Sequence, residues 1–357
     1  MSRHVFVIAE AGVNHNGRLD LGLELVDAAA DGGADAVKFQ TFRAASLATA
    51  AAPKASYQAR TTGDESQRAM LARLELSEDD HLALRDRATA RGIEFLSSPF
   101  DVDSIALLVG LGVRRLKIGS GELTNGPLLL AAARTGLPVI VSTGMARLDE
   151  IDAALGVLAF GIATPAGDPT TAALAEAATA PAGRAALRDR VSLLHCTTEY
   201  PAPIDEVNLR AMTVLRDRYD LEVGYSDHTA GIAVSIAAAA LGATIIEKHL
   251  TLDRSLPGPD HAASAEPAEL AAMVAAIRDV ERALGEAVKA PGPTELRNLP
   301  VARKSLVAAR AISAGAPFTP DNLAVKRPGT GRTPMDYWRL LGTPAGRDYA
   351  PDEAIDP

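Results

Sequence analysis

Eight short segments of the chain share one pattern of apolar and polar residues. In each, apolar residues come before a group of polar or charged ones: 5–10 (VFVIAE), 36–41 (AVKFQT), 94–99 (EFLSSP), 115–120 (RLKIGS), 138–143 (PVIVST), 192–197 (SLLHCT), 222–227 (EVGYSD) and 244–250 (TIIEKHL). Most are preceded by an Ala- and Leu-rich segment with helical spacing. Strand alternating with helix, eight times, predicts a (β/α)8 TIM barrel of the α/β class. A doubly wound open sheet is the alternative, but eight evenly repeated units favour closure.

The segment after the eighth predicted strand shows the helical pattern clearly. Pro267 suits a first helical turn, and Gly285 can close the helix. Between them, apolar residues recur every three to seven positions, at Leu270, Val274, Ile277 and Leu284. We therefore expect a helix from Pro267 to the residue before Gly285.

After Gly285 the composition changes. Residues 290–295 (APGPTE) are typical of a linker between domains. Beyond them lie short strand signals (SLVAA, LAVKR), turn-rich pieces and the only tryptophan, Trp338. We predict a catalytic barrel over residues 1–285, a semi-rigid linker over 286–298 and a small, mostly irregular or β domain over 299–357. The Ala/Pro/Thr-rich stretch around 161–190 is expected to be an elaborated connection remote from chemistry.

Charge and cysteine content narrow the class of protein. A net charge of −9 over 357 residues argues against a nucleic-acid or anionic-membrane partner. Cys196 is the only cysteine, which excludes an intrachain disulfide and fits a reducing cytoplasm. The apolar runs are too short for a signal peptide or a membrane span. We expect a cytoplasmic protein without membrane contact.

Two lysines lie on predicted strands among apolar neighbours. Side chains alternate along a strand, so Leu116 and Ile118 share one face while Lys117 takes the other. Lys38 repeats the arrangement between Val37 and Phe39. The outer face of a barrel strand packs on helices, so both lysines are expected to point inward. Two ammonium groups at one barrel mouth are costly without an anion between them.

Hydroxyl groups gather at the same level of the predicted barrel. Four strands carry them at their carboxyl ends: Ser98, Ser120, Ser142 and Ser226. Two ammonium groups and a ring of hydroxyl and backbone donors predict a phosphate pocket. Each serine taken singly is more often a helix N-cap or turn residue, but convergence from several strands favours a site.

The remaining polar strand ends suggest a metal. His228 follows the seventh strand and His249 ends the eighth, so two imidazoles could share one divalent ion. The alternative is that each histidine is only hydrogen-bonded. Glu10, which ends the first strand, could act as a base or orient a water. Cys196 lacks an evident activating partner, which favours a buried, inert thiol over a nucleophile. Spacing alone predicts a barrel enzyme for a small phosphorylated substrate and does not name the reaction.

The motifs in this order resemble one known family. IAEAGVNHNG, VKFQT, SSPF, KIGSGE, VSTGM, HCTTEYP, GYSDHT and EKHLTLDRSLPGPDHAAS are similar to those of the bacterial sialic acid (N-acetylneuraminate) synthases. KSLVAARAISAGAPFTPDNLAVKRPGTG resembles that family's C-terminal antifreeze-like (SAF) domain. The likeness covers nearly the whole chain. It implies a transferase that condenses phosphoenolpyruvate with an N-acylated mannosamine-type sugar and releases phosphate, in N-acetylneuraminate biosynthesis or that of a related nonulosonate such as legionaminic or pseudaminic acid.

The resemblance also implies roles for individual residues. Phosphoenolpyruvate would be held by Lys38, Ser98, Lys117, Ser120, Ser142 and Ser226. Mn²⁺ or Mg²⁺ would be bound by His228 and His249, with Glu10 as the acid or base beside it. The acceptor sugar would contact Gln40, Glu122, Thr198, Tyr200 and Asp260, Thr198 lying at a position that varies among relatives. The resemblance further implies a homodimer in which each SAF domain caps the partner's barrel. An arginine of the SAF domain, here Arg327, would then contact the sugar. The alternative is that Arg327 only braces the RPGTG turn.

Two rival functions stay open at this point. A Schiff-base aldolase on the same barrel would use Lys117 or Lys38 as its nucleophile. A carbohydrate-binding protein would rely on the C-terminal domain and leave the barrel inert. The histidine pair speaks against the first, and the full set of lysines, histidines and carboxylates speaks against the second.

Overall fold

The computed structural model describes residues 4–55 and 66–357. The chain divides into two compact units, one ending at Gly285 and the other spanning Glu286–Pro357. Each unit has its own apolar core, and each is described by itself.

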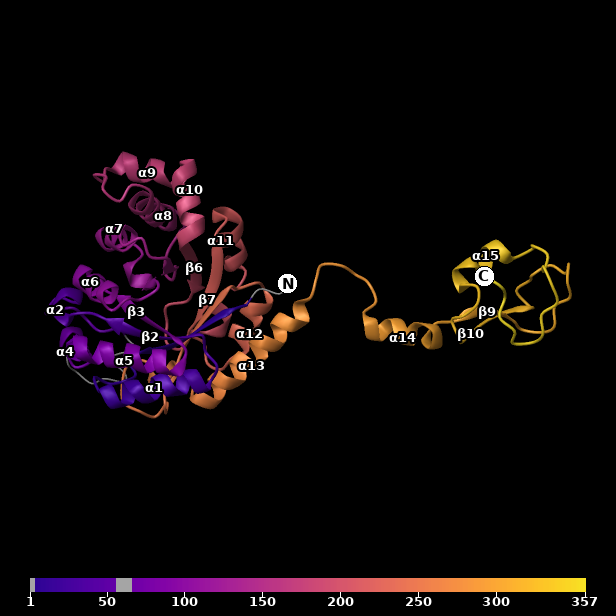
Figure 1. The fold of residues 1–357 in the computed structure, drawn as a ribbon, viewed down its shortest axis with the longest axis horizontal. Helices are drawn as coiled ribbons and strands as arrows, with labels where there is room; N and C mark the ends of the chain where they lie inside the picture. The colour runs from indigo at the N-terminus through magenta and orange to yellow at the C-terminus, as the bar shows by residue number, and fades with distance from the viewer. Residues whose placement is uncertain (1–3, 56–65) are drawn as a thin grey trace. The chain divides into compact units, whose positions relative to one another are not determined.

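The first unit is built on a sheet of eight parallel strands (Figure 1). The strands are β1 (Phe6–Gly12), β2 (Ala36–Thr41), β3 (Glu94–Pro99), β4 (Leu116–Ile118), β5 (Val139–Ser142), β6 (Val191–Cys196), β7 (Glu222–Asp227) and β8 (Ile245–His249). The sheet order is β3-β2-β1-β8-β7-β6-β5-β4, so β1 pairs with β8 and the sheet curls into a nearly closed barrel. All eight predicted strands are present, and the predicted TIM barrel is confirmed.

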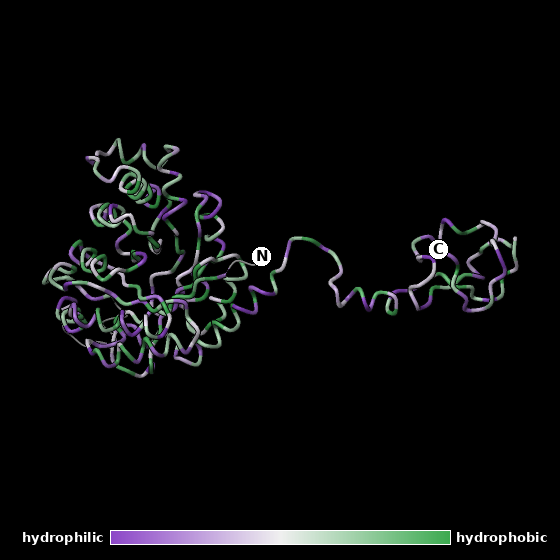
Figure 2. The backbone as a smooth tube through the Cα atoms, in the orientation of Figure 1, coloured by the Kyte–Doolittle hydropathy of each residue, from purple (hydrophilic) through white to green (hydrophobic). Residues whose placement is uncertain are grey.

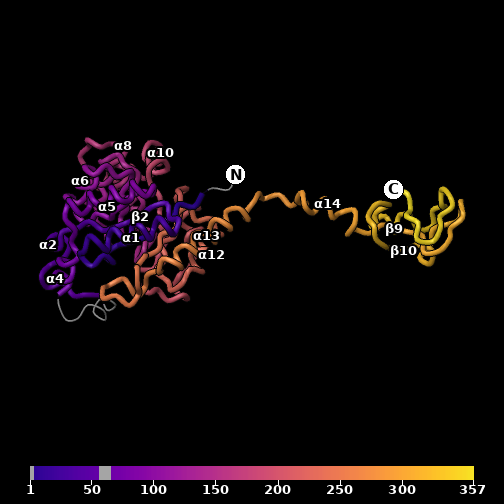
Figure 3. Tube along the Cα trace, turned by 60° about the horizontal axis from the view of Figure 1, so that its bottom comes forward, coloured from indigo at the N-terminus to yellow at the C-terminus, as the bar shows by residue number. Residues whose placement is uncertain are grey.

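Helices connect successive strands and form the outer layer (Figure 1). Those of the first half are α1 (Leu19–Asp31), α2 (Ala44–Leu47), α4 (Gln67–Ala72), α5 (Glu78–Arg91), α6 (Val102–Gly110) and α7 (Gly126–Arg134). Those of the second half are α8 (Leu148–Ala163), α9 (Thr171–Thr179), α10 (Pro181–Arg190), α11 (Ala211–Tyr219), α12 (Ala233–Ala240) and α13 (Pro267–Leu284). The short helices α2 and α4 lie next to each other at one edge of the barrel, in Figure 1 and in the turned view of Figure 3.

The predicted alternation of strand faces positions the polar residues. Val37 and Phe39 belong to the core between strands and helices, as do Leu116 and Ile118. The inward-facing residues at the lower end of the barrel form a separate apolar plug: Ile8, Ala36, Leu96, Ile140, Leu194 and Ile245. Nearer the carboxyl ends, the same faces carry lysines, carboxylates and hydroxyls. The plug therefore closes the barrel below a polar layer.

Two connections show how local sequence shapes the helical layer. The predicted helix after the eighth strand is α13, which buries Leu270, Val274 and Ile277 as expected but leaves Leu284, its last residue, 53% exposed. The elaborated connection around 161–190 contains α9 and α10, which pack against α8. This packing accounts for the mostly hydrophobic colouring of α8 in Figure 2, because helices cover it on more than one side.

The second unit differs from the prediction in its first residues. Helix α14 (Pro293–Ala302) begins inside the predicted semi-rigid linker (286–298) and continues into the predicted small domain. Pro293 stands in its first turn, and the Glu295 carboxylate accepts a hydrogen bond from the Gly292 amide at 2.9 Å, which caps the helix. The rest is largely irregular, as expected, with an antiparallel pair β9 (Ser305–Ala308) and β10 (Leu323–Lys326) and a short helix α15 (Tyr337–Leu340).

Candidate active site

A cavity of about 480 Å³ lies at the carboxyl ends of the barrel strands. Every predicted site residue of the barrel lines it: Glu10, Lys38, Gln40, Ser98, Lys117, Ser120, Glu122, Ser142, Thr198, Tyr200, Ser226, His228, His249 and Asp260. These side chains come from all eight strands or the loops that follow them. The fold therefore brings together residues that are up to 250 positions apart in sequence (Glu10 to Asp260).

Arg327 is the one predicted site residue outside this cavity. It lies in the second unit, just after β10, where its Nε donates a hydrogen bond to the Ala302 carbonyl oxygen at 3.0 Å. Within its own unit, Arg327 thus braces the end of α14. Its role toward the sugar stays a prediction.

The two inward lysines share a protein carboxylate that the sequence reasoning missed. Glu247 Oε1 lies 3.2 Å from Lys117 Nζ, and Glu247 Oε2 lies 3.6 Å from Lys38 Nζ. Lys38 also forms an ion pair with Glu10. Glu247 precedes His249 by two residues on β8, so the alternation that placed the lysines could have placed it on the inner face too. The anion that two buried lysines need is therefore partly supplied by the protein.

Burial and mutual charge set the ionisation of this cluster. Burial alone raises the pKa of Glu247, but the charges of Lys117 and Lys38 outweigh it and hold the pKa well below its ordinary value. Burial raises the pKa of Glu10 to about 7, although the Lys38 charge opposes this. Burial also lowers the pKa of Lys117, against the attraction of Glu247. Near neutral pH, Glu247 is ionised while Glu10 can gain or lose a proton.

The four serines are not helix caps. Ser98, Ser142 and Ser226 lie at or near the ends of β3, β5 and β7, and Ser120 opens a short 3-10 helix (Ser120–Glu122). Ser98 Oγ accepts a hydrogen bond from Lys38 Nζ at 3.1 Å, and Ser226 Oγ donates to Glu247 at 2.8 Å. Ser142 Oγ is buried without a hydrogen-bond partner. A buried hydroxyl left unpaired on a cavity wall indicates that a ligand completes its hydrogen bonding.

A close backbone approach fixes Ser120 on the cavity wall. The Gly144 amide donates to Ser120 Oγ at 3.0 Å, and Ser120 Oγ lies 3.1 Å from Cys196 Sγ. A Cβ at Gly144 would come within 2.3 Å of Thr198 Oγ1 and 2.8 Å of Ser120 Oγ, so this loop requires glycine. Burial raises the pKa of the Cys196 thiol, which agrees with an inert rather than a nucleophilic cysteine.

The two histidines face each other across neighbouring strands. Their ring centroids are 5.4 Å apart, and the ring of Tyr200 lies 4.3 Å from that of His228. His228 Nδ1 donates to the Thr197 carbonyl oxygen at 2.6 Å, so Nε2 carries the lone pair and lies 3.3 Å from Ser226 Oγ. Burial lowers the pKa of His228 to about 4 and that of His249 well below its ordinary value. Both rings are therefore neutral near pH 7, the form that binds metal.

These donors fit a divalent ion held by few protein ligands. His249 Nδ1 is buried without a hydrogen-bond partner and lies 3.8 Å from Asp260 Oδ2. Within residues 4–55 and 66–357, no group of three or more His, Cys, Asp or Glu side chains is arranged as a closed metal site. Two neutral imidazoles with a nearby carboxylate leave coordination positions open, which is the pattern of catalytic rather than structural metal sites.

The residues expected to contact the acceptor sugar lie around the histidines and at the opposite wall. Burial raises the pKa of Asp260 to about 6, although the Lys38 charge opposes this. Gln40 Nε2 lies 3.4 Å from Glu10 Oε1, and Glu122 Oε2 accepts a hydrogen bond from Asn125 at 2.7 Å. Asp260, Gln40 and Glu122 all line the cavity, and their sugar-binding roles stay predictions.

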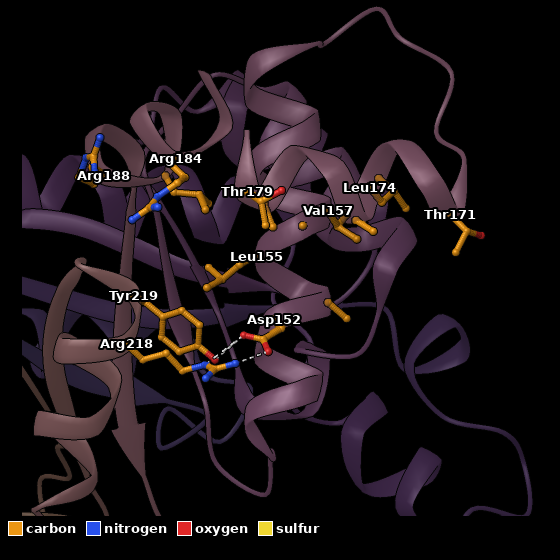
Figure 4. Close-up of a pocket in the computed structure, with 15 residues that line it drawn as sticks. Asp152, Leu155, Val157, Thr171, Leu174, Thr179, Arg184, Arg188, Arg218 and Tyr219 are labelled. Atoms are coloured by element: carbon orange, nitrogen blue, oxygen red, sulfur yellow. Dashed lines mark hydrogen bonds and ion pairs between the residues drawn. The ribbon is translucent and has the colours of Figure 1, made fainter. Parts of the chain in front are cut away.

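A larger cavity, of about 710 Å³, lies outside the barrel between α8, α9, α10 and the end of α11 (Figure 4). Its walls carry Leu155 and Leu174, and at one end Arg218 Nη2 contacts Asp152 Oδ2 at 2.7 Å while Tyr219 OH contacts Asp152 Oδ1 at 2.9 Å. None of the predicted site residues lines it. Asp152 pairs with Arg218, and Arg184 and Arg188 also line the walls. Among the described residues, none of the buried side-chain atoms that lack a hydrogen-bond partner belongs to this lining, in contrast to the barrel cavity.

The fold and the barrel cavity define a class of protein. A TIM barrel with buried lysines, titratable carboxylates and neutral histidines at the carboxyl ends of its strands is a catalytic barrel. None of the helices in the described part of the chain is long and apolar enough to cross a membrane.

Comparison with known proteins assigns the chain to a family. Residues 25–289 match the NeuB family and residues 303–357 match the SAF domain. The chain is 46% identical to the N,N'-diacetyllegionaminic acid synthase of Campylobacter jejuni over 99% of both chains, and 46% identical to that of Legionella pneumophila over 95% of this chain and 89% of the relative. The crystal structure of N-acetylneuraminic acid (sialic acid) synthetase from Leptospira borgpetersenii has a TM-score of 0.67 and 34% identity, covering 83% of this chain and 90% of that chain.

The chain belongs to the NeuB family, with a C-terminal SAF domain. It is a nonulosonate synthase, a transferase that forms a carbon–carbon bond. The predicted family and enzyme class are thereby confirmed, and the Schiff-base aldolase and the carbohydrate-binding protein are set aside.

Proposed function

We propose that this enzyme makes a legionaminic acid, by condensing phosphoenolpyruvate with a diacetamido-trideoxyhexose. The observation that carries the choice of acceptor is the identity to two N,N'-diacetyllegionaminic acid synthases, 46% in each case, against 34% for the sialic acid synthetase structure. N-acetylneuraminate synthesis from N-acetylmannosamine, the first expectation from the motifs, is therefore the second candidate.

The polar layer of the barrel suits the donor substrate. The phosphate and carboxylate of phosphoenolpyruvate would lie among Lys38, Lys117 and the hydroxyls of Ser98, Ser120, Ser142 and Ser226. Glu247 holds both lysines in place beforehand, at 3.2 Å and 3.6 Å. Because these groups are fixed before the substrate arrives, they stabilise the departing phosphate without reorganising.

His228 and His249 would hold a divalent ion, Mn²⁺ or Mg²⁺. When bound, such an ion polarises the acceptor aldehyde and favours ionisation of water. The chain's own part is to keep both imidazoles neutral by burial and to orient His228 through the Thr197 carbonyl. The unpaired Nδ1 of His249 supports this assignment.

Glu10 is the residue proposed to move a proton during the reaction. The methylene carbon of phosphoenolpyruvate bonds to the aldehyde carbon, whose oxygen takes up a proton. A water adds at the neighbouring, phosphate-bearing carbon and loses a proton. The adduct then collapses to the ketone and expels phosphate, which takes the remaining hydroxyl proton. A carboxyl group with a pKa of about 7 can exchange protons in either direction at neutral pH. Glu10 lies beside Lys38 and Gln40, on the cavity wall where these steps would occur.

A phosphate-release assay tests the acceptor. Purified enzyme with phosphoenolpyruvate and Mn²⁺ would be given a diacetamido-trideoxyhexose, its stereoisomer used for pseudaminic acid, and N-acetylmannosamine. We expect the highest kcat/KM with the diacetamido sugar that leads to legionaminic acid. Preference for N-acetylmannosamine would instead establish the second candidate.

We further propose that two chains form a homodimer in which each SAF domain caps the partner's barrel and presents Arg327 to the sugar. The barrel cavity opens at the strand ends, and a truncation after Gly285 should lose activity while the barrel still folds. Mixing Arg327→Ala and Lys117→Met chains should restore activity, since one of the two composite sites in a heterodimer has both residues. Two inactive parents that exchange subunits without regaining activity would contradict the exchanged cap.

A further inference from the structure

The barrel-mouth cavity has two chemically different sides. One carries the lysines, histidines and carboxylates already described. The other is lined mainly by apolar side chains: Val13, Leu47, Met70, Leu71, Leu74 and Phe100, with Gln67 as a polar residue among them. A site for phosphoenolpyruvate and a metal alone has no need of this second side, because both of those ligands are charged.

The apolar side is a built structure rather than a chance exposure of core residues. Met70 and Leu74 are 1% and 7% exposed and form a small core with Val13 and Phe42. Leu47, at the end of α2, and Leu71, in α4, pack on this core but are only partly buried.

Phe100, just after β3, completes this surface. Its ring meets that of Phe42 edge to face, with centroids 6.0 Å apart and an interplanar angle of 88°. Such a contact fixes the ring orientation. Leu47, Leu71 and Phe100 therefore present a firm surface toward the cavity, which we call the apolar wall.

We propose that the apolar wall selects the acceptor sugar, by contacting a deoxygenated carbon and an acyl methyl group of a diacetamido-trideoxyhexose. This inference rests on the proposed function. The wall fits an acceptor role, because the same cavity also holds the histidines, Tyr200 and Asp260 that would surround the reacting end of the sugar. The rest of the sugar then extends toward α2 and α4.

The chemistry of the two competing acceptors gives the wall its discriminating power. A trideoxy sugar with a second acetamido group offers methyl groups where N-acetylmannosamine has hydroxyls. Moving a methyl group from water into contact with leucine and phenylalanine side chains favours binding. Hydroxyls in the same position lose water without gaining a hydrogen-bond partner, which opposes binding. One or two such differences in an apolar pocket discriminate by roughly ten- to two-hundredfold.

The test compares both acceptors in single variants of the wall. Leu71→Ala should lower kcat/KM for the diacetamido-trideoxyhexose about tenfold, with little change for N-acetylmannosamine or in the KM for phosphoenolpyruvate. Leu47→Asn, which offers an amide to a hydroxyl, should raise the relative kcat/KM for N-acetylmannosamine. Leu174→Ala, a leucine of the outer cavity, is the matched control and should leave the ratio of the two acceptors unchanged.

The outcomes separate this inference from the proposed function. If wild-type enzyme does not prefer the diacetamido sugar, the proposed function fails. If it does prefer that sugar but Leu71→Ala and Leu47→Asn lower both acceptors equally, the wall does not select the acceptor. Leu71→Met keeps the apolar volume and should retain the wild-type ratio, so loss of the ratio there, with unchanged thermal unfolding, would also overturn the inference.

Discussion

Two cavities of the first unit, the barrel cavity and the outer cavity between α8, α9 and α10, differ in their chemistry as well as in their volume. The outer cavity is larger, about 710 Å³ against 480 Å³, and lies between helices (Figure 4). Arg218 and Asp152 form an ion pair at one end of it, and none of the described residues that line it carries a buried polar side-chain atom without a hydrogen-bond partner. The barrel cavity holds unpaired buried atoms, including Ser142 Oγ and His249 Nδ1, and carboxyl groups with shifted pKa values.

This difference follows from how each cavity is built. Eight strand ends converge on the barrel mouth, so side chains from the whole chain meet there above an apolar plug that excludes water from below. The outer cavity arises where one connection contains three helices, α8, α9 and α10. Converging strand ends bring many polar side chains into one cavity, whereas a connection with extra helices leaves a cavity between those helices without gathering such side chains.

The largest effect should come from the histidines. His228→Ala or His249→Ala would remove one of the two proposed metal ligands and should reduce turnover at least about a thousandfold, since a bound metal contributes several kcal/mol to catalysis. Chelation of wild-type enzyme with EDTA should inactivate it, and Mn²⁺ should restore activity. Circular dichroism would check that the variants fold. Full turnover after exhaustive chelation would refute the metal assignment.

The next effect concerns Glu10 and the pH dependence of turnover. Because burial raises its pKa to about 7, the profile of kcat/KM against pH should contain an ionisation near 7. His228 cannot account for it, since its pKa is lowered to about 4. Glu10→Gln should abolish that ionisation and reduce kcat about a hundredfold or more. An unchanged profile in Glu10→Gln would assign the ionisation to another group.

Much of this site was predictable because its residues obey the period of a strand. Alternation placed Lys117 opposite to Leu116 and Ile118, and the ends of eight repeated units placed the serines and histidines together. Family motifs then supplied the roles. The same alternation places Glu247 on the inner face, where it pairs with both lysines. This carboxylate was missed because the anion that the lysines require was expected to come from the substrate alone.

The features that escaped prediction have no such period. Leu47 and Leu71 lie on helices of four and six residues in an irregular connection, too short for a hydrophobic repeat. The start of helix α14 falls in the segment predicted as a semi-rigid linker from its Pro/Gly-rich residues 290–295, yet proline is also favourable in the first turn of a helix. Composition alone does not distinguish these two uses of proline.

A smaller effect is expected from Lys117. Lys117→Met removes one of two ammonium groups that would face the phosphate and should raise the KM for phosphoenolpyruvate about thirtyfold, corresponding to about 2 kcal/mol for a charge-assisted contact. The KM for the acceptor should change far less. The variant also leaves Glu247 with Lys38 as its remaining lysine partner, so its thermal unfolding needs to be compared. Equal increases in both KM values would indicate a structural role.

The smallest effect should come from substitutions in the outer cavity, which test whether that cavity takes no part in catalysis. Leu174 lines that cavity, is only partly buried and lies on α9, far in sequence from any strand end. Leu174→Ala should change kcat/KM for either substrate by less than about twofold and the free energy of unfolding by about 1 kcal/mol, as is usual for a partly exposed leucine. Arg184→Ala, at an exposed arginine of the same cavity, should be milder still. Steady-state kinetics and urea unfolding would measure both. A loss of turnover like that of His228→Ala, in a variant that remains folded, would show that the outer cavity takes part in catalysis and that convergence of strand ends is not what separates the two.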